Sequence, residues 1–243
     1  EEPIVQELAN EYLTEQGITI LNDVTLNSVS NDGNKPVITA NGQNYTFDAV
    51  LYATGRKPNT ANIGLENTDI TTNERGAIVV NDTCESSVPG VYAVGDVNGG
   101  PQFTYISLDD FRIVFGALTG NGQYTLKDRK NIPYTTFLTP PLARVGLTEE
   151  DAINKGYTVK TKEMLVATMP RAHVNDYLKG AFKIVVNADN DLILGATLYS
   201  QGAEELINLI KMAMDNNIPY TYFKNQIFTH PTMAENLNDL CNF

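Results

Sequence analysis

The residues best suited to chemistry in this chain are a histidine and a glutamate five positions apart, in the segment His230-Pro231-Thr232-Met233-Ala234-Glu235. Histidine is the only side chain whose unperturbed pKa lies near neutrality, so His230 can take up a proton and return it. Glu235 can accept a hydrogen bond from the other ring nitrogen and fix the tautomer. The pair is a candidate general acid and base. A lone histidine before a proline is also typical of a structural loop, and the segment alone does not decide between the two.

A second candidate is the aspartate that ends the segment Gly90-Val91-Tyr92-Ala93-Val94-Gly95-Asp96. The small and branched apolar residues predict a β-strand covered on both faces, and Gly95 lets a ligand approach the backbone closely. Ligands of open α/β sheets bind at the carboxyl ends of the strands, so Asp96 can accept hydrogen bonds from a sugar or ribityl hydroxyl. A plain turn explains this segment equally well on its own.

A third segment, Ala49-Val50-Leu51-Tyr52-Ala53-Thr54-Gly55, predicts another apolar strand that ends in a glycine turn. In this order and at these separations, the three segments resemble the class I flavin-dependent pyridine nucleotide-disulfide oxidoreductases, the family of glutathione reductase, dihydrolipoyl dehydrogenase and mercuric reductase. The resemblance extends over essentially the whole chain. It implies a homodimeric enzyme that passes electrons from NAD(P)H through FAD and a redox dithiol to a disulfide or metal-ion acceptor.

The resemblance also implies which residues bind the flavin. Gly95 and Asp96 match the second flavin-binding motif of the family, whose aspartate bonds the ribityl chain. Thr104 and Tyr105 match positions where backbone N–H groups at a helix N-terminus face the flavin ring and stabilise negative charge on it. Gly55 matches a tight turn near the flavin nucleotide. On sequence alone, an ordinary helix cap is an equally good interpretation of Thr104.

The catalytic pair is implied in the same way. His230 and Glu235 match the family's His-Pro motif, in which the pair serves the dithiol of the opposite subunit. The resemblance implies cis peptide bonds at His230-Pro231 and at Thr139-Pro140. Few X–Pro bonds in folded proteins are cis, about 5%, so these bonds are an informative test of the resemblance.

Two features of the family are missing from the sequence. It has no Gly-x-Gly-x-x-Gly loop to hold a pyrophosphate at a helix N-terminus. Its two cysteines, Cys84 and Cys241, are far apart, whereas the family's dithiol is a closely spaced pair in the amino-terminal half. We therefore expect the chain to be the carboxy-terminal half of the enzyme, inactive and without flavin when alone. Both cysteines are expected to be inert packing or surface thiols.

The composition limits the partners. A net charge of −12 argues against nucleic acid and anionic membrane surfaces, which require a basic patch. No apolar run approaches the roughly 20 residues of a membrane span. Two cysteines in 243 residues form no disulfide framework, which indicates a reducing, cytoplasmic compartment. With only His173 and His230 available as imidazole ligands, no metal site is expected.

The first half of the chain predicts an α/β remnant of nucleotide-binding domains. Apolar residues at helical spacing predict helices over 4–13, ended by Gly17, and over 106–118. Residues 18–21 predict a short strand, and residues 37–47 predict a hairpin around Asn41-Gly42, which suits positive φ. Residues 1–55 are expected to end the NAD(P)-binding domain, and residues 56–130 to form the carboxy-terminal part of the FAD-binding domain.

Residues 131–243 predict an α+β domain, an antiparallel sheet with helices on one face. Thr148 begins a helix much as a capping box would. Strands are expected over 181–186 and 192–198, and helices over 203–214 and 233–240. The helix over 203–214 is apolar on more than one face, so part of it is expected to contact a second surface. In the resembled family this region is the dimerisation domain.

The carboxy-terminal segment carries residues that bear on the subfamily. Mercuric reductases carry a vicinal cysteine pair at the carboxy terminus, and only Cys241 is present here, so that activity is doubtful. Arg171-Ala172 and the ending 233–240 are similar to the bacterial branch of reactive-chlorine-resistance flavoproteins. The alternative function is a dimerising scaffold without catalysis. The histidine and Gly-Asp motifs favour the enzyme, because a scaffold needs neither a base nor a flavin ligand.

Overall fold

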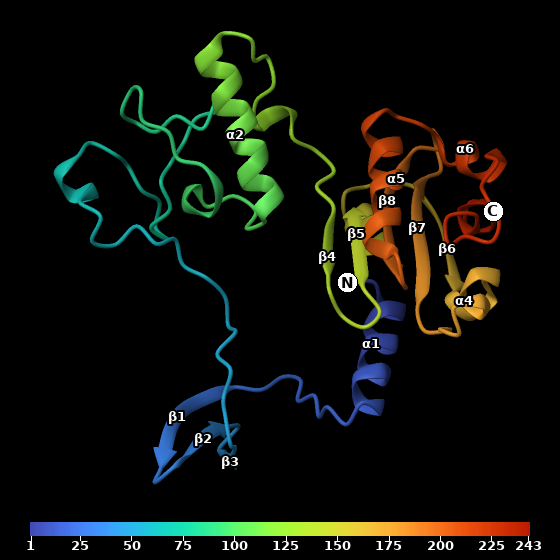
Figure 1. Cartoon of the computed structure of the whole chain (residues 1–243), viewed down its shortest axis with the longest axis horizontal. Coiled ribbons are helices and arrows are strands. Elements are labelled where there is room, and N and C mark those ends of the chain that lie inside the picture. Colours follow the sequence, from blue (N-terminus) through green and yellow to red (C-terminus); the bar gives the residue numbers. More distant parts are fainter. The chain divides into compact units, whose positions relative to one another are not determined.

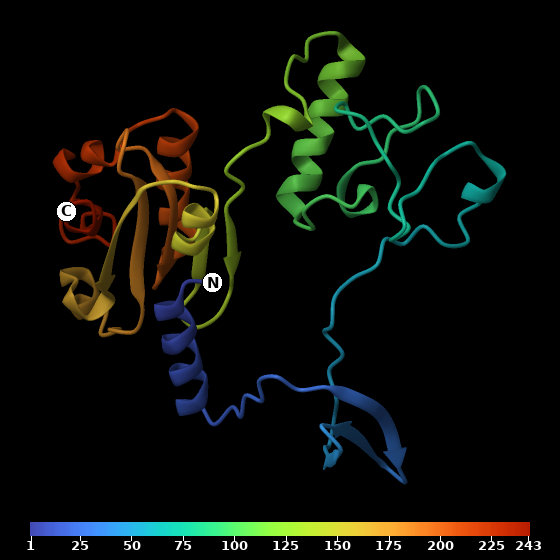
Figure 2. The ribbon, with the colours of Figure 1, turned by 180° about the vertical axis from the view of Figure 1, so that it is seen from behind.

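A computed structural model describes residues 1–243, which divide into two units. Unit 1 comprises Glu1–Ile20 and Lys130–Phe243, and unit 2 comprises Leu21–Arg129. Figures 1 and 2 show the ribbon from opposite sides. The amino-terminal helix thus groups with the carboxy-terminal residues, although residues 1–55 were expected to end an NAD(P)-binding domain. The two units do not test the functional division at residues 55 and 130, which stays a prediction.

Unit 1 is built on a five-stranded antiparallel sheet with the order β4-β5-β8-β7-β6 (Figure 1). Its strands are β4 (Tyr134–Thr136), β5 (Leu142–Gly146), β6 (Val159–Leu165), β7 (Ala181–Asn187) and β8 (Ile193–Tyr199). The predicted strands over 181–186 and 192–198 are confirmed as β7 and β8, the central hairpin. Every residue of β7 is buried, as expected for a strand covered on both faces.

The larger core lies on one face of this sheet, beneath α5 (Ala203–Asp215). Leu206, Ile207 and Ile210 of α5 pack there against β5, β7 and β8, together with residues of α4 (Pro170–Val174), α6 (Tyr220–Asn225) and α7 (Asn236–Leu240). The helix predicted over 203–214 is therefore confirmed. The helix predicted over 233–240 is shorter, because residues before Asn236 form the turn that holds the histidine motif.

The opposite face of the same sheet is also covered by helices. Tyr12 of α1 (Pro3–Glu15) packs against Leu142 and Tyr199, which alternate along their strands with residues of the larger core. Helix α3 (Glu149–Asn154) begins with the predicted capping box at Thr148 and lies on this side of the sheet (Figure 2). The α+β class is confirmed, with one difference: helices cover both faces of the sheet, and on this side Glu2, the N-cap of α1, and Glu149 of α3 pair with Lys183 of β7.

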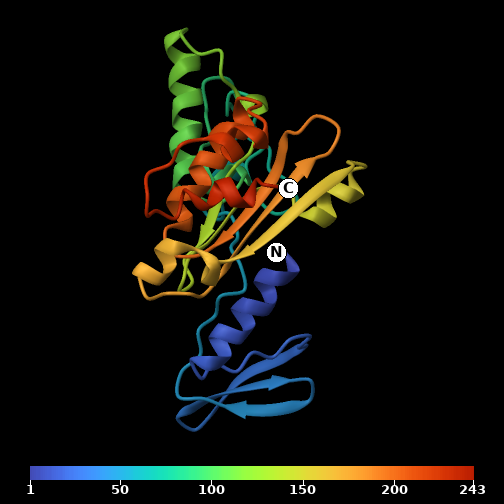
Figure 3. The same ribbon diagram turned by 90° about the vertical axis from the view of Figure 1, so that its right-hand side faces the viewer.

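Unit 2 begins with the small sheet β1-β2-β3, drawn in blue in Figure 3. The strands are β1 (Leu26–Asp32), β2 (Lys35–Ala40) and β3 (Gln43–Thr46). The predicted hairpin is confirmed, with Asn41 and Gly42 at φ 49° and 76°. The predicted strand over 18–21 is wrong, since these residues have no strand partner. Strand β1 was not predicted, because its seven residues are mostly polar and all exposed.

The apolar segments over 49–54 and 91–94 do not form regular strands, so both predictions are wrong. A strand requires a hydrogen-bonded neighbour. Tyr92 forms only an isolated bridge with Glu85, and residues 49–54 form none. Leu51 is consequently 91% exposed, and Val91 and Val94 are also exposed.

The helix predicted over 106–118 is confirmed as α2 (Thr104–Thr119), which ends at Gly120 with φ 69°. The chain also contains short 3-10 helices, labelled η1 (Leu65–Asn67), η2 (Gly95–Asn98), η3 (Leu126–Asp128) and η4 (Val166–Thr168). No helix in the structure combines the length and apolar character needed to cross a bilayer.

Candidate functional site

The histidine motif of unit 1 forms a closed turn before α7. The peptide bonds His230-Pro231 and Thr139-Pro140 are both cis, as the resemblance implied. His230 Nδ1 lies 2.8 Å from Glu235 Oε2. The other carboxylate oxygen, Oε1, accepts the backbone N–H of Thr232 at 3.1 Å, and the Thr232 hydroxyl accepts the N–H of Glu235 at 3.2 Å. The turn thus holds the Glu235 carboxylate in place, and the carboxylate orients the His230 imidazole.

This arrangement keeps the Glu235 carboxylate ionised and selects one tautomer of the neutral imidazole. The hydrogen bond from His230, supported by the Thr232 N–H, lowers the pKa of Glu235 below its ordinary value. The carboxylate is therefore ionised at neutral pH and can only accept hydrogen bonds, so the neutral imidazole carries its proton on Nδ1. The His230 side chain is 68% exposed and the Glu235 side chain 19% exposed, which leaves Nε2 accessible for proton exchange.

The Gly-Asp turn of unit 2 lies in η2, where Gly95 has φ 75°. A Cβ atom at Gly95 would come within 2.5 Å of the Ser107 hydroxyl, so a larger residue does not fit. Asp96 is about half exposed, and its Oδ2 lies 3.6 Å from Arg56 Nη1. Arg56 follows Gly55, which has φ 116°. The structure therefore brings two of the three sequence motifs together.

The N-terminus of α2 follows this turn. Thr104 is the first residue of the helix and Phe103 is its N-cap, so the interpretation of Thr104 as the cap is wrong. Phe103 is apolar and supplies no capping oxygen; its ring stacks on Tyr105 with a centroid distance of 5.0 Å. Burial raises the pKa of Tyr105. No side-chain cap hydrogen bond closes the helix start, where the positive end of the helix dipole favours negative charge.

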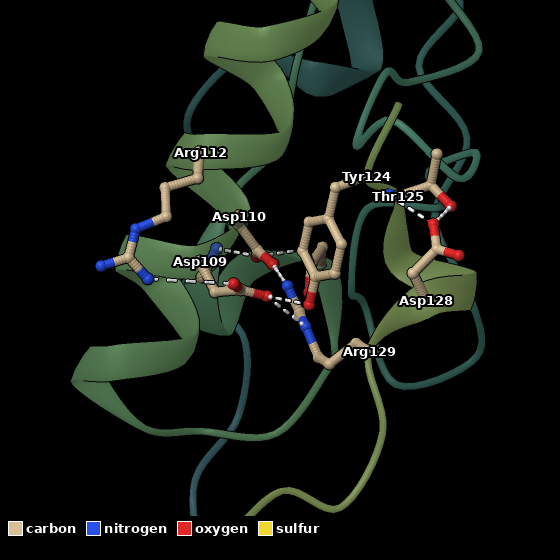
Figure 4. Close-up of polar contacts among 9 residues, drawn as sticks. Asp109, Asp110, Arg112, Tyr124, Thr125, Asp128 and Arg129 are labelled. Carbon is tan, nitrogen blue, oxygen red and sulfur yellow. Dashed lines mark hydrogen bonds and ion pairs between the residues drawn. The ribbon is translucent and has the colours of Figure 1, made fainter. Parts of the chain in front are cut away.

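Sequence reasoning missed the polar network behind the turn. Asp110, fully buried on α2, accepts the Gly95 N–H at 2.7 Å and pairs with Arg129 (Figure 4). The only sequence signal is an acidic residue at 110 on the same helical face as Ile106 and Ile113.

The predicted residues therefore form two groups. His230 and Glu235 belong to unit 1, whereas Gly55, Gly95, Asp96, Thr104 and Tyr105 belong to unit 2. Their roles stay predictions. No cluster of three or more His, Cys, Asp or Glu side chains in the chain is arranged to hold a metal ion.

Both cysteines are free and buried, and neither is expected to react in the folded chain. Burial, assisted by the charge of Asp110, raises the pKa of Cys84 to about 11. Burial raises the pKa of Cys241 to about 12. The thiolate is the reactive form, so labelling by a disulfide reagent at pH 8 should be ~10²-fold or more slower than for free cysteine. The rate should rise with pH and become fast in denaturant. Rapid labelling of either thiol under native conditions would contradict this prediction.

Comparisons with known proteins agree with these motifs. Residues 1–110 match the family described as pyridine nucleotide-disulphide oxidoreductase, and residues 132–241 match its dimerisation domain. The probable pyridine nucleotide-disulfide oxidoreductase RclA of Escherichia coli K12 is 44% identical over 228 residues, which are 94% of this chain and 52% of that protein. A mercuric reductase of Staphylococcus aureus is 36% identical over 240 residues, 97% of this chain and 44% of that protein.

Solved structures give the same result. The HOCl-induced flavoprotein disulfide reductase RclA from Escherichia coli matches with a TM-score of 0.95 and 41% identity, over 99% of this chain and 55% of that one. Its Cu(II) complex also matches with a TM-score of 0.95. The chain spans about half the length of the curated relatives it matches. With both family regions present in order over nearly the whole sequence, the chain belongs to the pyridine nucleotide-disulphide oxidoreductase family.

Proposed function

We propose that the protein containing this chain is a homodimeric flavoprotein oxidoreductase that passes electrons from NAD(P)H through FAD and a redox dithiol, lying outside these residues, to a disulfide or metal-ion acceptor. The observation that carries the proposal is the His230–Glu235 pair, with Nδ1 held at 2.8 Å and Nε2 accessible. A dimerising scaffold has no use for an oriented base. We propose the RclA-like branch, given the 44% identity.

The described residues fit FAD. Asp96 has one long ionic contact, to Arg56, and is about half exposed, so its carboxylate can accept a ribityl hydroxyl. Gly95 leaves room where a Cβ would collide with Ser107. The N-terminal end of α2 at Thr104, which is positive through the helix dipole, suits negative charge on the flavin ring. When bound, FAD supplies the capacity to accept a hydride and release its electrons to a dithiol.

His230 would move the proton in the thiol chemistry. Nε2 can take the proton of an attacking thiol and return it to a leaving thiol, a transfer that typically contributes ~10²–10⁴-fold in rate. Glu235 keeps the proton on Nδ1 and stabilises the imidazolium when it forms. A metal ion as the alternative acceptor is supported by two matches, a relative named mercuric reductase and a solved structure of RclA in complex with Cu(II). A metal ion would be a substrate here.

The homodimer is proposed for residues 131–243. Apolar side chains of unit 1 remain exposed: Met212 by 62%, Phe137 by 78% and Ile227 by 91%. Apolar exposure of this kind is expected where a partner surface covers the chain.

We propose residues 1–55 and 56–130 as parts of the NAD(P)- and FAD-binding domains. The free cysteines suit a reducing compartment such as the cytoplasm.

Flavin binding tests the proposal directly. The full-length protein should purify with bound FAD that either NADH or NADPH bleaches. Asp96→Ala should raise the dissociation constant for FAD about ten-fold or more, because a hydrogen bond to a charged group is lost. Asp69→Ala, at an exposed aspartate of the same unit, is the matched control and should leave the constant unchanged. A colourless wild-type protein, or equal constants for the two variants, would contradict the proposed flavin site.

A further inference from the structure

The side chain of Asp110 is completely buried in the middle of α2, between Ile106 and Ile113 along the same helical face. A buried carboxylate is costly unless hydrogen bonds and an opposite charge compensate it. If position 110 served only to pack the helix against its surroundings, an apolar residue would suffice.

Asp110 has three polar partners. Its Oδ2 accepts the backbone N–H of Gly95 at 2.7 Å and the side-chain amide of Asn98 at 2.9 Å. Its Oδ1 accepts from Arg129 Nη2, and Arg129 is itself only 10% exposed. Figure 4 shows the Arg129 guanidinium reaching both Asp110 and Asp109, the latter through Nε at 2.7 Å. The carboxylate is thus compensated on both oxygens.

Two of these three partners are the first and last residues of the same short turn, η2 (Gly95–Asn98). The turn also carries Asp96, whose side chain has only the 3.6 Å contact with Arg56 to orient it. Gly95 sits against Ser107 of α2, where a Cβ would approach to 2.5 Å. The backbone of the turn is therefore fixed to α2 on its inner side, while Asp96 is exposed on the outer side.

We propose that Asp110 is a positioning residue for flavin binding: held by Arg129, it fixes the ends of the Gly95–Asn98 turn and so sets the direction of the Asp96 carboxylate. This inference rests on the proposed function, since it assumes that Asp96 binds FAD. Asp110 itself touches no ligand. A purely structural Asp110 would stabilise unit 2 without any specific coupling to Asp96.

The test uses the full-length protein and four variants: Asp96→Ala, Asp110→Asn, the double variant, and the control Asp109→Asn. Asp109 binds the same arginine but makes no contact with the turn. The dissociation constant of each apoprotein for FAD is measured by quenching of flavin fluorescence. Thermal unfolding of the apoproteins is recorded alongside.

Asp110→Asn should raise the dissociation constant about ten-fold, because one carboxylate oxygen becomes a donor facing other donors. Asp109→Asn should change it by no more than about two-fold, even where both variants lose similar thermal stability. The double variant should bind FAD almost as well as Asp96→Ala alone, since Asp110 acts through Asp96.

Two results would overturn the proposal: equal constants for Asp110→Asn and Asp109→Asn, or multiplying effects in the double variant. If Asp96→Ala binds FAD with the wild-type dissociation constant, the flavin site itself is overturned, and the positioning role with it. If Asp96→Ala binds FAD more weakly but Asp110→Asn has the wild-type dissociation constant, only the positioning role is overturned. If Asp110→Asn does not fold, Arg129→Gln replaces it. Arg129→Gln should raise the dissociation constant for FAD about three-fold, and combining it with Asp96→Ala should add little to the effect of Asp96→Ala alone. If the two effects multiply in that double variant, the proposal is also overturned.

Discussion

Replacing His230 by alanine in the full-length protein is expected to slow turnover with a disulfide acceptor by ~10²-fold or more, while FAD binding stays unchanged. The reason is local. Nε2 is the accessible end of an imidazole whose other nitrogen is held 2.8 Å from Glu235, and alanine leaves the dithiol without a proton acceptor. The residues that we propose for flavin binding all lie in unit 2, which contains neither residue of the pair.

Stopped-flow measurement separates the two halves of the reaction. The rate at which NAD(P)H bleaches the visible absorbance should change by less than about two-fold in His230→Ala, because this half does not use the base. The rate of reoxidation by the acceptor should carry the whole loss. Glu235→Gln should lose less than His230→Ala, since an amide oxygen still accepts from Nδ1 but no longer stabilises the imidazolium.

The matched control is His173→Ala, because His173 is the other histidine of the chain. Its Nε2 lies 2.8 Å from the Ala167 carbonyl oxygen, and no carboxylate partner orients the ring. This variant should keep both half-reactions. An unchanged reoxidation rate in His230→Ala would remove this residue from the mechanism and leave it a structural turn residue.

Elements with a strong local pattern were predicted correctly. The helix α5 follows from its apolar period, and the hairpin β2-β3 follows from Asn41-Gly42, whose residues tolerate positive φ. Strands β1, β4, β5 and β6 were not predicted, and β1 and β6 show one reason. Their residues are mostly polar or charged and only partly buried at best, so the sequence carries no alternation that marks a strand.

The apolar segments over 49–54 and 91–94 show the opposite error. Their composition is that of buried strands, yet Leu51 is 91% exposed, because no neighbouring strand within the chain pairs with it. Composition predicts what a segment can form, and the partner decides whether it forms.

The same distinction applies to the sites. His230 and Glu235 are five residues apart, so their contact follows from one local turn and could be proposed from spacing. Asp110 meets Gly95 across 15 residues and Arg129 across 19, and these contacts exist only once α2 has packed against the turn. A single acidic residue on an apolar helix face reveals that something compensates it, but not what.

The buried cation of unit 1 was likewise missed. Lys183 is 5% exposed on β7, and its Nζ lies 2.9 Å from Glu2, 2.7 Å from Glu149 and 3.0 Å from Glu163. Glu2 is buried as well and also accepts the N–H of Glu149 at 2.8 Å. One lysine therefore joins the chain start, α3 and β6 to the centre of the sheet.

Burial alone would lower the pKa of Lys183, but hydrogen bonds to Glu149, Glu2 and Glu163 outweigh it and raise the pKa above its ordinary value. A raised pKa in the folded state means that the network's contribution to stability is fully present below about pH 10 and is lost only as the pH rises through the raised value. The network is therefore at full strength at neutral pH.

Lys183→Met is expected to lower the free energy of unfolding of unit 1 by ~3–5 kcal/mol at neutral pH, because it leaves the Glu2 carboxylate buried without a cation. Hydrogen exchange of the β7 and β8 amides in increasing urea measures this loss within the unit. Lys179→Met is the matched control: Lys179 pairs with Glu15 at an exposed site that water screens, so its loss of stability should be much smaller. Adding Glu2→Gln to Lys183→Met should recover much of the stability, because the amide removes the uncompensated charge and still accepts the Glu149 N–H. If Lys183→Met costs no more than Lys179→Met, the network does not hold the amino-terminal segment to the sheet.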